Sequence, residues 1–200
     1  MGAVTLSVEK LPGFRLERTG RLGSRFRALG VEDFRLAAGY VRDLPYGRNS
    51  DRSDWGLVLA ENRGTCSTKH ALLTALAREH GASVELRLGV YLMDGTNTPG
   101  VAGVLEASGL AGLPEAHCYL AYRGERVDVT GVEANTAKEF LYEESIEPDQ
   151  IGAYKLDLHR RFLRTWATER RLDPERVWRV REECIGALSA RARSGTEDNL

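Results

Sequence analysis

The stretch Arg63-Gly64-Thr65-Cys66-Ser67-Thr68-Lys69-His70 carries the strongest structural signal in the sequence, and the mainly apolar segment 71–77 follows it at once. A glycine turn gives way to small polar residues and then to good helix formers with apolar side chains at helical spacing. The pattern predicts a helix that runs to about Glu79 and has Cys66 in or just before its first turn. There the unpaired amides and the positive end of the helix dipole favour a thiolate over a thiol. Cys66 is therefore a candidate nucleophile.

Two residues further along the chain complete a pattern typical of thiol catalysis. His117 lies in the segment Glu-Ala-His-Cys-Tyr-Leu-Ala-Tyr at 115–122, and Asp128 lies in Glu-Arg-Val-Asp-Val-Thr at 125–130. In such a constellation the histidine takes and returns a proton, and the acid orients the imidazole. His70, one helical turn after Cys66, is expected to pack beneath the site and support it.

These residues resemble the transglutaminase-like superfamily of papain-fold cysteine enzymes, in the order G-x-C at a helix start, H on a strand and D-x-T on the next strand. The resemblance covers roughly residues 31–131, because the family commonly has a Pro-Tyr-like segment and a short helix before the cysteine. This chain has Leu44-Pro45-Tyr46 and then 54–60 in those places. The resemblance implies an α+β papain/transglutaminase-like core with the cysteine helix packed on an antiparallel sheet. It also implies acyl transfer, or hydrolysis of a peptide, protein or small amide substrate, through a thioester on Cys66, with no metal or organic cofactor.

The interval from His117 to Asp128 is 128 − 117 = 11 residues, which is shorter than is usual in that family and predicts a tight hairpin. A two-residue turn at Arg123–Gly124 pairs Tyr119 with Asp128 and places the acid on the same face as His117, one diagonal step away. A three-residue turn would place the acid on the opposite face and weaken the triad.

The groups that would stabilise an oxyanion are less well defined by the sequence. The backbone amide of Cys66 is one natural donor, because it opens a helix. In the resembling enzymes a side chain upstream of the cysteine helps to stabilise the oxyanion, and the candidates in that region are Asn49, Trp55 and Asn62. Trp55 is expected to pack in the core rather than to donate. Gly64 would leave room for a substrate to approach the sulfur.

The composition limits the partners and the location. Lys plus Arg is 28 and Asp plus Glu is 29, a formal charge of −1, which argues against a nucleic acid partner. No long apolar run predicts a membrane span, and residues 1–10 lack the apolar core of a signal peptide. Three cysteines do not make a disulfide framework. We therefore expect a cytoplasmic domain that does not contact a membrane.

The chain divides into four predicted parts. Residues 1–30 are read as an N-terminal strand or arm that carries several arginines, and 31–155 as the catalytic core, in which 139–150 is acidic and irregular. Residues 156–190 are expected to form a helical pair on the core, and 191–200 a flexible tail. The first helix of the pair has Leu158, Phe162 and Trp166 on one face; the second begins at Asp173-Pro174 and has the stripe Val177, Val180, Cys184 and Leu188.

Three alternatives compete with this interpretation. Cys66, His70, His117 and Cys118 include zinc-ligand types, but adjacent strand residues project to opposite faces, so no metal is expected. An arylamine N-acetyltransferase-like protein would use the same Cys-His-Asp order with an acetyl donor. A binding module could keep the fold without turnover. Cys118 and Cys184 are interpreted as buried apolar side chains.

Overall fold

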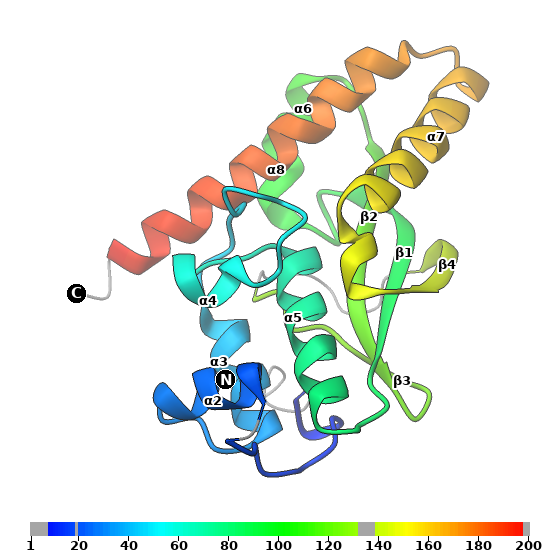
Figure 1. The fold of residues 1–200 in the computed structure, drawn as a ribbon. Coiled ribbons are helices and arrows are strands. Elements are labelled where there is room, and N and C mark those ends of the chain that lie inside the picture. The colour runs from blue at the N-terminus through cyan, green and yellow to red at the C-terminus, as the bar shows by residue number, and fades with distance from the viewer. Residues whose placement is uncertain (1–7, 19, 132–138, 198–200) are drawn as a thin grey trace.

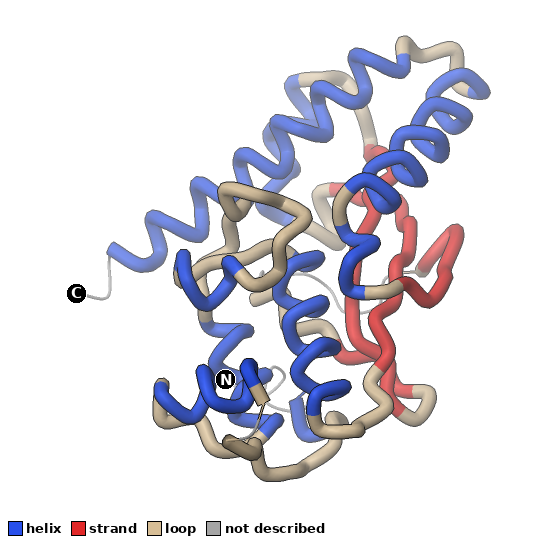
Figure 2. The backbone as a smooth tube through the Cα atoms, viewed as in Figure 1, coloured by secondary structure: helices blue, strands red, loops and turns tan. Residues whose placement is uncertain are grey.

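The computed structural model describes residues 8–18, 20–131 and 139–197, and its elements carry the labels of Figure 1. The strands form one sheet in the order β3-β2-β1-β4, in which every neighbouring pair is antiparallel. Figure 2 shows these strands gathered on one side of the molecule, with helices beside and beyond them. The described chain therefore has the α+β class that the sequence predicts. The strands are β1 (Glu85–Asp94), β2 (Gly112–Tyr122), β3 (Glu125–Val127) and β4 (Phe140–Ile146).

The helices fall into two groups around this sheet (Figure 1). The first group lies beside the sheet, and the second lies at its end, where α8 runs antiparallel to α7. No helix in the described ranges is both long enough and apolar enough to cross a bilayer. The first group is α2 (Arg21–Ala28), α3 (Phe34–Asp43), α4 (Leu57–Glu61) and α5 (Cys66–Glu79). The second is α6 (Ala102–Ala107), α7 (Ala153–Glu169) and α8 (Pro174–Glu197), with short 3-10 turns at Pro99–Val101 and Pro148–Ile151.

The cysteine helix α5 is the centre of the fold. It packs against α2 and α3 on one side and against β1 and β2 on the other, so most of its side chains are buried. Thr65 and Thr68 form a capping box, in which the Thr65 amide donates to Thr68 Oγ1 at 3.0 Å. This cap starts the helix at Cys66, and the first-turn position that the sequence predicts for the cysteine is confirmed.

The hairpin between β2 and β3 has the predicted two-residue turn. Leu120 pairs with Val127 and Tyr122 with Glu125, and both turn residues, Arg123 and Gly124, have positive φ angles of 51° and 81°. Such a turn matches the twist of the flanking strands. The register carries the residues after β3 back towards His117, which is what the triad requires.

One prediction for the sheet is wrong, because residues 139–150 are not irregular. Phe140–Ile146 forms the edge strand β4, and Leu86 of β1 pairs with Ile146. An edge strand is paired on one side only and tolerates exposed charge. The glutamates of β4 therefore obscure the alternation of apolar and polar residues by which a strand is predicted. Phe140 lies across Gly89 of β1, where a Cβ atom would be only 2.3 Å from the ring.

The N-terminal region packs against the core wherever it is described. Val4, Leu6 and Val8 alternate as in a strand; the first two lie outside the described residues, whereas Val8 is helical and buried. From residue 8 onwards Leu11, Leu16 and Phe26 are buried, so this part is a packed layer rather than an arm. The Glu79 carboxylate at the end of α5 accepts the amides of Leu22 and Gly23 at 2.9 and 2.7 Å, which anchors the first turn of α2.

The two C-terminal helices form where the sequence predicts them. Asp173 Oδ1 accepts the Glu175 amide at 3.0 Å, and the predicted apolar stripe of α8 is buried. In α7, however, the buried face is Lys155, His159, Leu163 and Ala167, whereas the predicted stripe Leu158, Phe162 and Trp166 is half-buried. Helix α8 extends to Glu197, through most of the segment expected to be a tail.

Candidate active site

The structure brings Cys66, His117 and Asp128 together. Cys66 opens α5, His117 lies on β2, and Asp128 immediately follows β3. His117 Nε2 lies 2.6 Å from Asp128 Oδ2. His117 also hydrogen-bonds the Cys66 sulfur, and because Nε2 faces the carboxylate, Nδ1 is the nitrogen available for that bond. The three residues thus form one connected line from sulfur to carboxylate.

The Asp128 carboxylate is itself held in place. Its Oδ1 accepts the Thr130 amide at 2.9 Å and also the Thr130 hydroxyl. The other oxygen, Oδ2, is thereby directed to His117. This gives the threonine of the D-x-T sequence a specific role, because it fixes the orientation of the acid that orients the imidazole.

His70 supports the site from beneath, as predicted. Its Nδ1 lies 2.6 Å from the Cys66 carbonyl oxygen, and its Nε2 lies 2.8 Å from the Val129 amide. Because a backbone amide can only donate, Nε2 accepts, and Nδ1 carries the proton and donates to the carbonyl. Burial lowers the pKa of His70 to about 4, which keeps the ring neutral. The neutral ring therefore ties the first residue of α5 to the strand end that carries Asp128.

A buried lysine makes a second such tie. Lys69 is fully buried, and its ammonium donates to three backbone carbonyls: Leu44 at 2.6 Å, Thr130 at 2.8 Å and Arg42 at 3.2 Å. These bonds use all three donors of the ammonium. They join α5 to the end of α3 and to the turn after Asp128.

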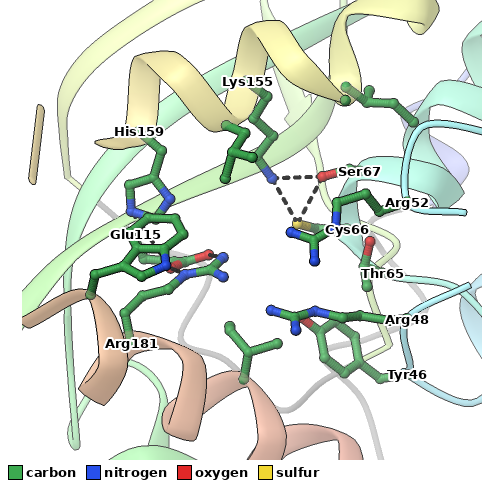
Figure 3. A pocket seen from close by; sticks show the side chains of 15 residues that line it. Tyr46, Arg48, Arg52, Thr65, Cys66, Ser67, Glu115, Lys155, His159 and Arg181 are labelled. Carbon is green, nitrogen blue, oxygen red and sulfur yellow. Dashed lines mark hydrogen bonds and ion pairs between the residues drawn. The ribbon is translucent and has the colours of Figure 1, made fainter. Parts of the chain in front are cut away.

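Another lysine, Lys155 of α7, lies beside the reactive sulfur (Figure 3). Its Nζ donates to Ser67 Oγ at 2.6 Å and lies 3.7 Å from Cys66 Sγ. Burial by itself raises the pKa of Cys66, but the charge of Lys155 and the charge and hydrogen bond of His117 outweigh it and lower the pKa to about 5. The other two thiols, of Cys118 and Cys184, have pKa values that burial raises to about 11. Cys66 is thus the thiol that is ionised near neutral pH.

Two cavities meet at the sulfur. The His117 cavity has a volume of about 40 Å³ and the Lys155 cavity about 70 Å³. The two cavities adjoin, because four residues line both, and α8 contributes to the wall of each; the shared residues are Cys66, Tyr46, Glu115 and Ile185. The remaining lining of the His117 cavity is Tyr91, Met93, Thr98, His117, Asp128, Thr130 and Leu188. The Lys155 cavity is also lined by Arg48, Arg52, Thr65, Ser67, Ile151, Gly152, Lys155, Leu156, His159, Trp178 and Arg181.

The wall of the Lys155 cavity contains a buried ion pair. Arg181 Nε and Nη2 donate to the two oxygens of Glu115, both at 2.7 Å. Burial by itself raises the pKa of Glu115, but the charge of Arg181 outweighs it and lowers the pKa to about 2. Arg181 and Arg48 both also reach Glu182, each at 2.7 Å. The charges of Arg48 and Arg181 are therefore balanced by carboxylates.

The side chains considered as upstream oxyanion donors serve the loop before the cysteine instead. Asn49 is buried; its Nδ2 donates to Glu61 and to the Arg63 carbonyl, and its Oδ1 accepts from Thr68. Trp55 packs against two apolar clusters, and Asn62 is exposed at the end of α4 with φ of 50°. A Cβ atom at Gly64 would lie 2.9 Å from Lys69 Cγ, so this glycine permits close packing on α5.

Sequence reasoning missed the residues that line the cavities from elsewhere in the chain. Tyr46 bridges to Gly64 and so lies beside the cysteine loop. Lys155 and His159 stand at the i, i+4 positions of α7 that continue to Leu163 and Ala167. This spacing of four is the signal that could have placed Lys155 on the buried face.

No group of three His, Cys, Asp or Glu side chains among residues 8–18, 20–131 and 139–197 is placed to hold a metal ion. Comparison of the chain with protein-family models, with curated proteins and with solved structures finds no significant match.

Proposed function

We propose that the chain is a transglutaminase-like cysteine enzyme that transfers or hydrolyses acyl groups through a thioester on Cys66. The observation that carries the proposal is the connected line from Cys66 to His117 and from His117 to Asp128, with 2.6 Å between the last two. A thiol of pKa about 5 at a helix start beside a carboxylate-bound imidazole has the nucleophile, the base and the orienting acid of thiol catalysis.

The arrangement of the elements supports a papain/transglutaminase-like core as part of this proposal. The cysteine helix α5 contacts β2, and the hairpin of β2 and β3 carries the histidine and leads to the acid. This is the spatial order that the motifs of that superfamily would need.

The reaction follows from the positions of the groups. The Cys66 thiolate attacks the carbonyl carbon, a bond from Sγ to that carbon forms, and the carbonyl electron pair moves to oxygen. When the tetrahedral species collapses, the bond to the leaving amine or alcohol breaks and His117 supplies its proton. Asp128 stabilises the imidazolium before that transfer. Water or an amine, deprotonated by His117, then attacks the thioester and regenerates the thiolate.

Lys155 supplies a stabilising charge for the oxyanion. The Cys66 amide has no acceptor within its helix, as is general for the first turn, so it is a second donor. While the sulfur is a thiolate, Lys155 balances its charge at 3.7 Å. When the sulfur attacks the carbonyl, the negative charge moves to the oxygen of the tetrahedral species, where Lys155 can stabilise it. The mechanism therefore does not need the upstream side-chain donor that the sequence left undefined.

The sizes of the cavities favour a small acyl group or a single extended side chain at the sulfur. Volumes of about 40 and 70 Å³ hold a few water molecules each. The burial of Lys155 beside Cys66 also argues against a non-catalytic module. Two buried charges cost free energy that an apolar pair would not, and activation of the Cys66 thiol is a reason to keep them.

The experiment is hydrolysis of 4-nitrophenyl acetate by the wild type and by Cys66→Ala, His117→Ala and Cys184→Ala. We expect turnover in the wild type and in Cys184→Ala, a matched control in the core of α8, and loss of turnover in the other two. Equal rates in Cys66→Ala and wild type would refute the proposal. Acetyl transfer from acetyl-coenzyme A to an arylamine, measured in parallel, would identify the N-acetyltransferase-like alternative.

A further inference from the structure

One arginine at the Lys155 cavity lacks a carboxylate partner in the described part of the chain. Arg181 is paired with Glu115, Arg48 with Glu182, and Lys155 with the thiolate. Arg52 also lines this cavity, is exposed, and makes no ion pair with any carboxylate in the described part of the chain. Figure 3 shows its side chain extending, like that of Arg48, from the loop before α4 towards the space that the labelled side chains surround. The cavity, which Cys66 also lines, therefore has an excess positive charge.

The position of His117 decides which part of a substrate enters this cavity. His117 must protonate the leaving group, and it lines the His117 cavity but not the Lys155 cavity, whereas Lys155 lines only the latter. The leaving group and the incoming acceptor therefore belong in the His117 cavity. The acyl group, attached to the same carbonyl carbon, extends into the Lys155 cavity, where Arg52 and Arg48 lie.

We propose that the substrate's acyl group carries a carboxylate, which Arg52 binds in the Lys155 cavity with Arg48 beside it. This inference rests on the proposed function. A single uncompensated guanidinium matches a single negative charge, and its planar fork suits a carboxylate. Acylation strengthens the attraction for the carboxylate of the acyl group, because it removes the negative charge of the thiolate and leaves the Lys155 ammonium without a counter-charge. The substrates are then half-amides, half-esters or half-thioesters of short dicarboxylic acids, or amides whose acyl part has a free carboxylate.

The subsite can be tested without any acyl transfer, by alkylating Cys66 with iodoacetate and with iodoacetamide. The two reagents have the same reacting carbon and differ in one negative charge. The ratio of their rates cancels any change in the ionised fraction of the thiol, since both require the same thiolate. We expect saturation with iodoacetate in the wild type, and protection by glutarate. Protection by inorganic phosphate at least as strong as by glutarate would refute the assignment to a carboxylate.

The variants are Arg52→Gln, Arg52→Lys and the matched control Arg164→Gln, which removes an exposed arginine from α7. Arg52→Gln should lower the ratio of iodoacetate to iodoacetamide rates about fivefold, as is typical of a partly exposed charge pair. Arg52→Lys should restore most of the ratio, and Arg164→Gln should leave it unchanged. Equal ratios in Arg52→Gln and wild type would overturn the proposal.

A second comparison links the subsite to catalysis. Mono-4-nitrophenyl adipate should acylate the wild type faster than its methyl ester does, and Arg52→Gln should lose that preference. If neither ester acylates Cys66, the proposed acyl chemistry fails, whereas the alkylation ratio still decides whether the anion subsite exists. A preference for the methyl ester in the wild type would contradict the carboxylate assignment directly.

Discussion

Replacing Lys155 by methionine removes the cation beside the reactive sulfur at little cost in volume. Nζ lies 3.7 Å from Sγ, and Lys155 is buried, with 8% of its surface exposed. Two unit charges at that distance interact by about 4 kcal/mol at an effective dielectric constant of about 20, which corresponds to about 3 pKa units. The pKa of Cys66 should therefore rise from about 5 in the wild type to about 8 in Lys155→Met.

The assay is the rate of alkylation of Cys66 by iodoacetamide as a function of pH. The midpoint of the profile is the informative quantity, because a thiolate of higher pKa is also more nucleophilic and offsets part of the loss of rate at any single pH. Lys155→Arg should keep a low midpoint, since it keeps the charge. Lys10→Met, an exposed lysine paired with Glu125, is the matched control and should leave the profile unchanged.

Superimposable profiles for the wild type and Lys155→Met would contradict the role of Lys155 as the counter-ion of the thiolate. They would mean that Lys155 does not stabilise the thiolate, and the role given to it in the oxyanion would have no basis. The melting temperature of the variant near pH 7 should stay close to that of the wild type, because a Cys66 thiol with a pKa of about 8 is then mostly neutral and no buried charge is left without a partner. A large drop would show a structural role for the ammonium.

Three further predictions follow from the same geometry. Asp128→Asn should fold normally but lose acylation rate by orders of magnitude, because the amide does not stabilise the imidazolium; an unchanged rate would show that Asp128 has no part in catalysis. Limiting iodoacetamide near neutral pH should label Cys66 first, since burial raises the pKa of Cys118 and Cys184 to about 11; peptide mapping that finds either of these labelled first would contradict this. Urea unfolding should show that the wild type loses about 3 kcal/mol more stability than His70→Gln between about pH 6.5 and pH 4, because burial lowers the pKa of His70 to about 4 and the native ring does not take up the proton that the unfolded chain binds. A His70→Gln variant with the same pH dependence would contradict that assignment.

The parts of the site that the sequence predicts are those encoded by local patterns. The cysteine helix follows from helical spacing after Gly64, and the relation of His117 to Asp128 follows from strand parity and one turn at Gly124. His70 follows from its distance of one helical turn from Cys66. Each of these inferences uses residues within about a dozen positions of one another, where backbone geometry alone fixes which side chains share a face.

The parts that the sequence does not predict depend on packing between distant segments. Lys155 reaches Cys66 across 89 residues, and only the docking of α7 on β2 brings the two together. Strand β4 escapes prediction for a different reason: an edge strand needs one buried face at most, and its charged residues obscure the period of two. Asn49 is a candidate oxyanion donor by its place in the sequence, but in the structure it orients the loop through Thr68.

The thioester on Cys66 is tested most directly by the mass of the protein after brief reaction with an activated acetyl ester and acid quenching. We expect one added acetyl group in the wild type, located on Cys66 by peptide mapping and removed by neutral hydroxylamine, as is typical of a thioester. Cys66→Ala should remain unmodified under the same conditions. Modification at Lys155 or at another residue with Cys66 unchanged, or equal acetylation of Cys66→Ala, would contradict the thioester mechanism.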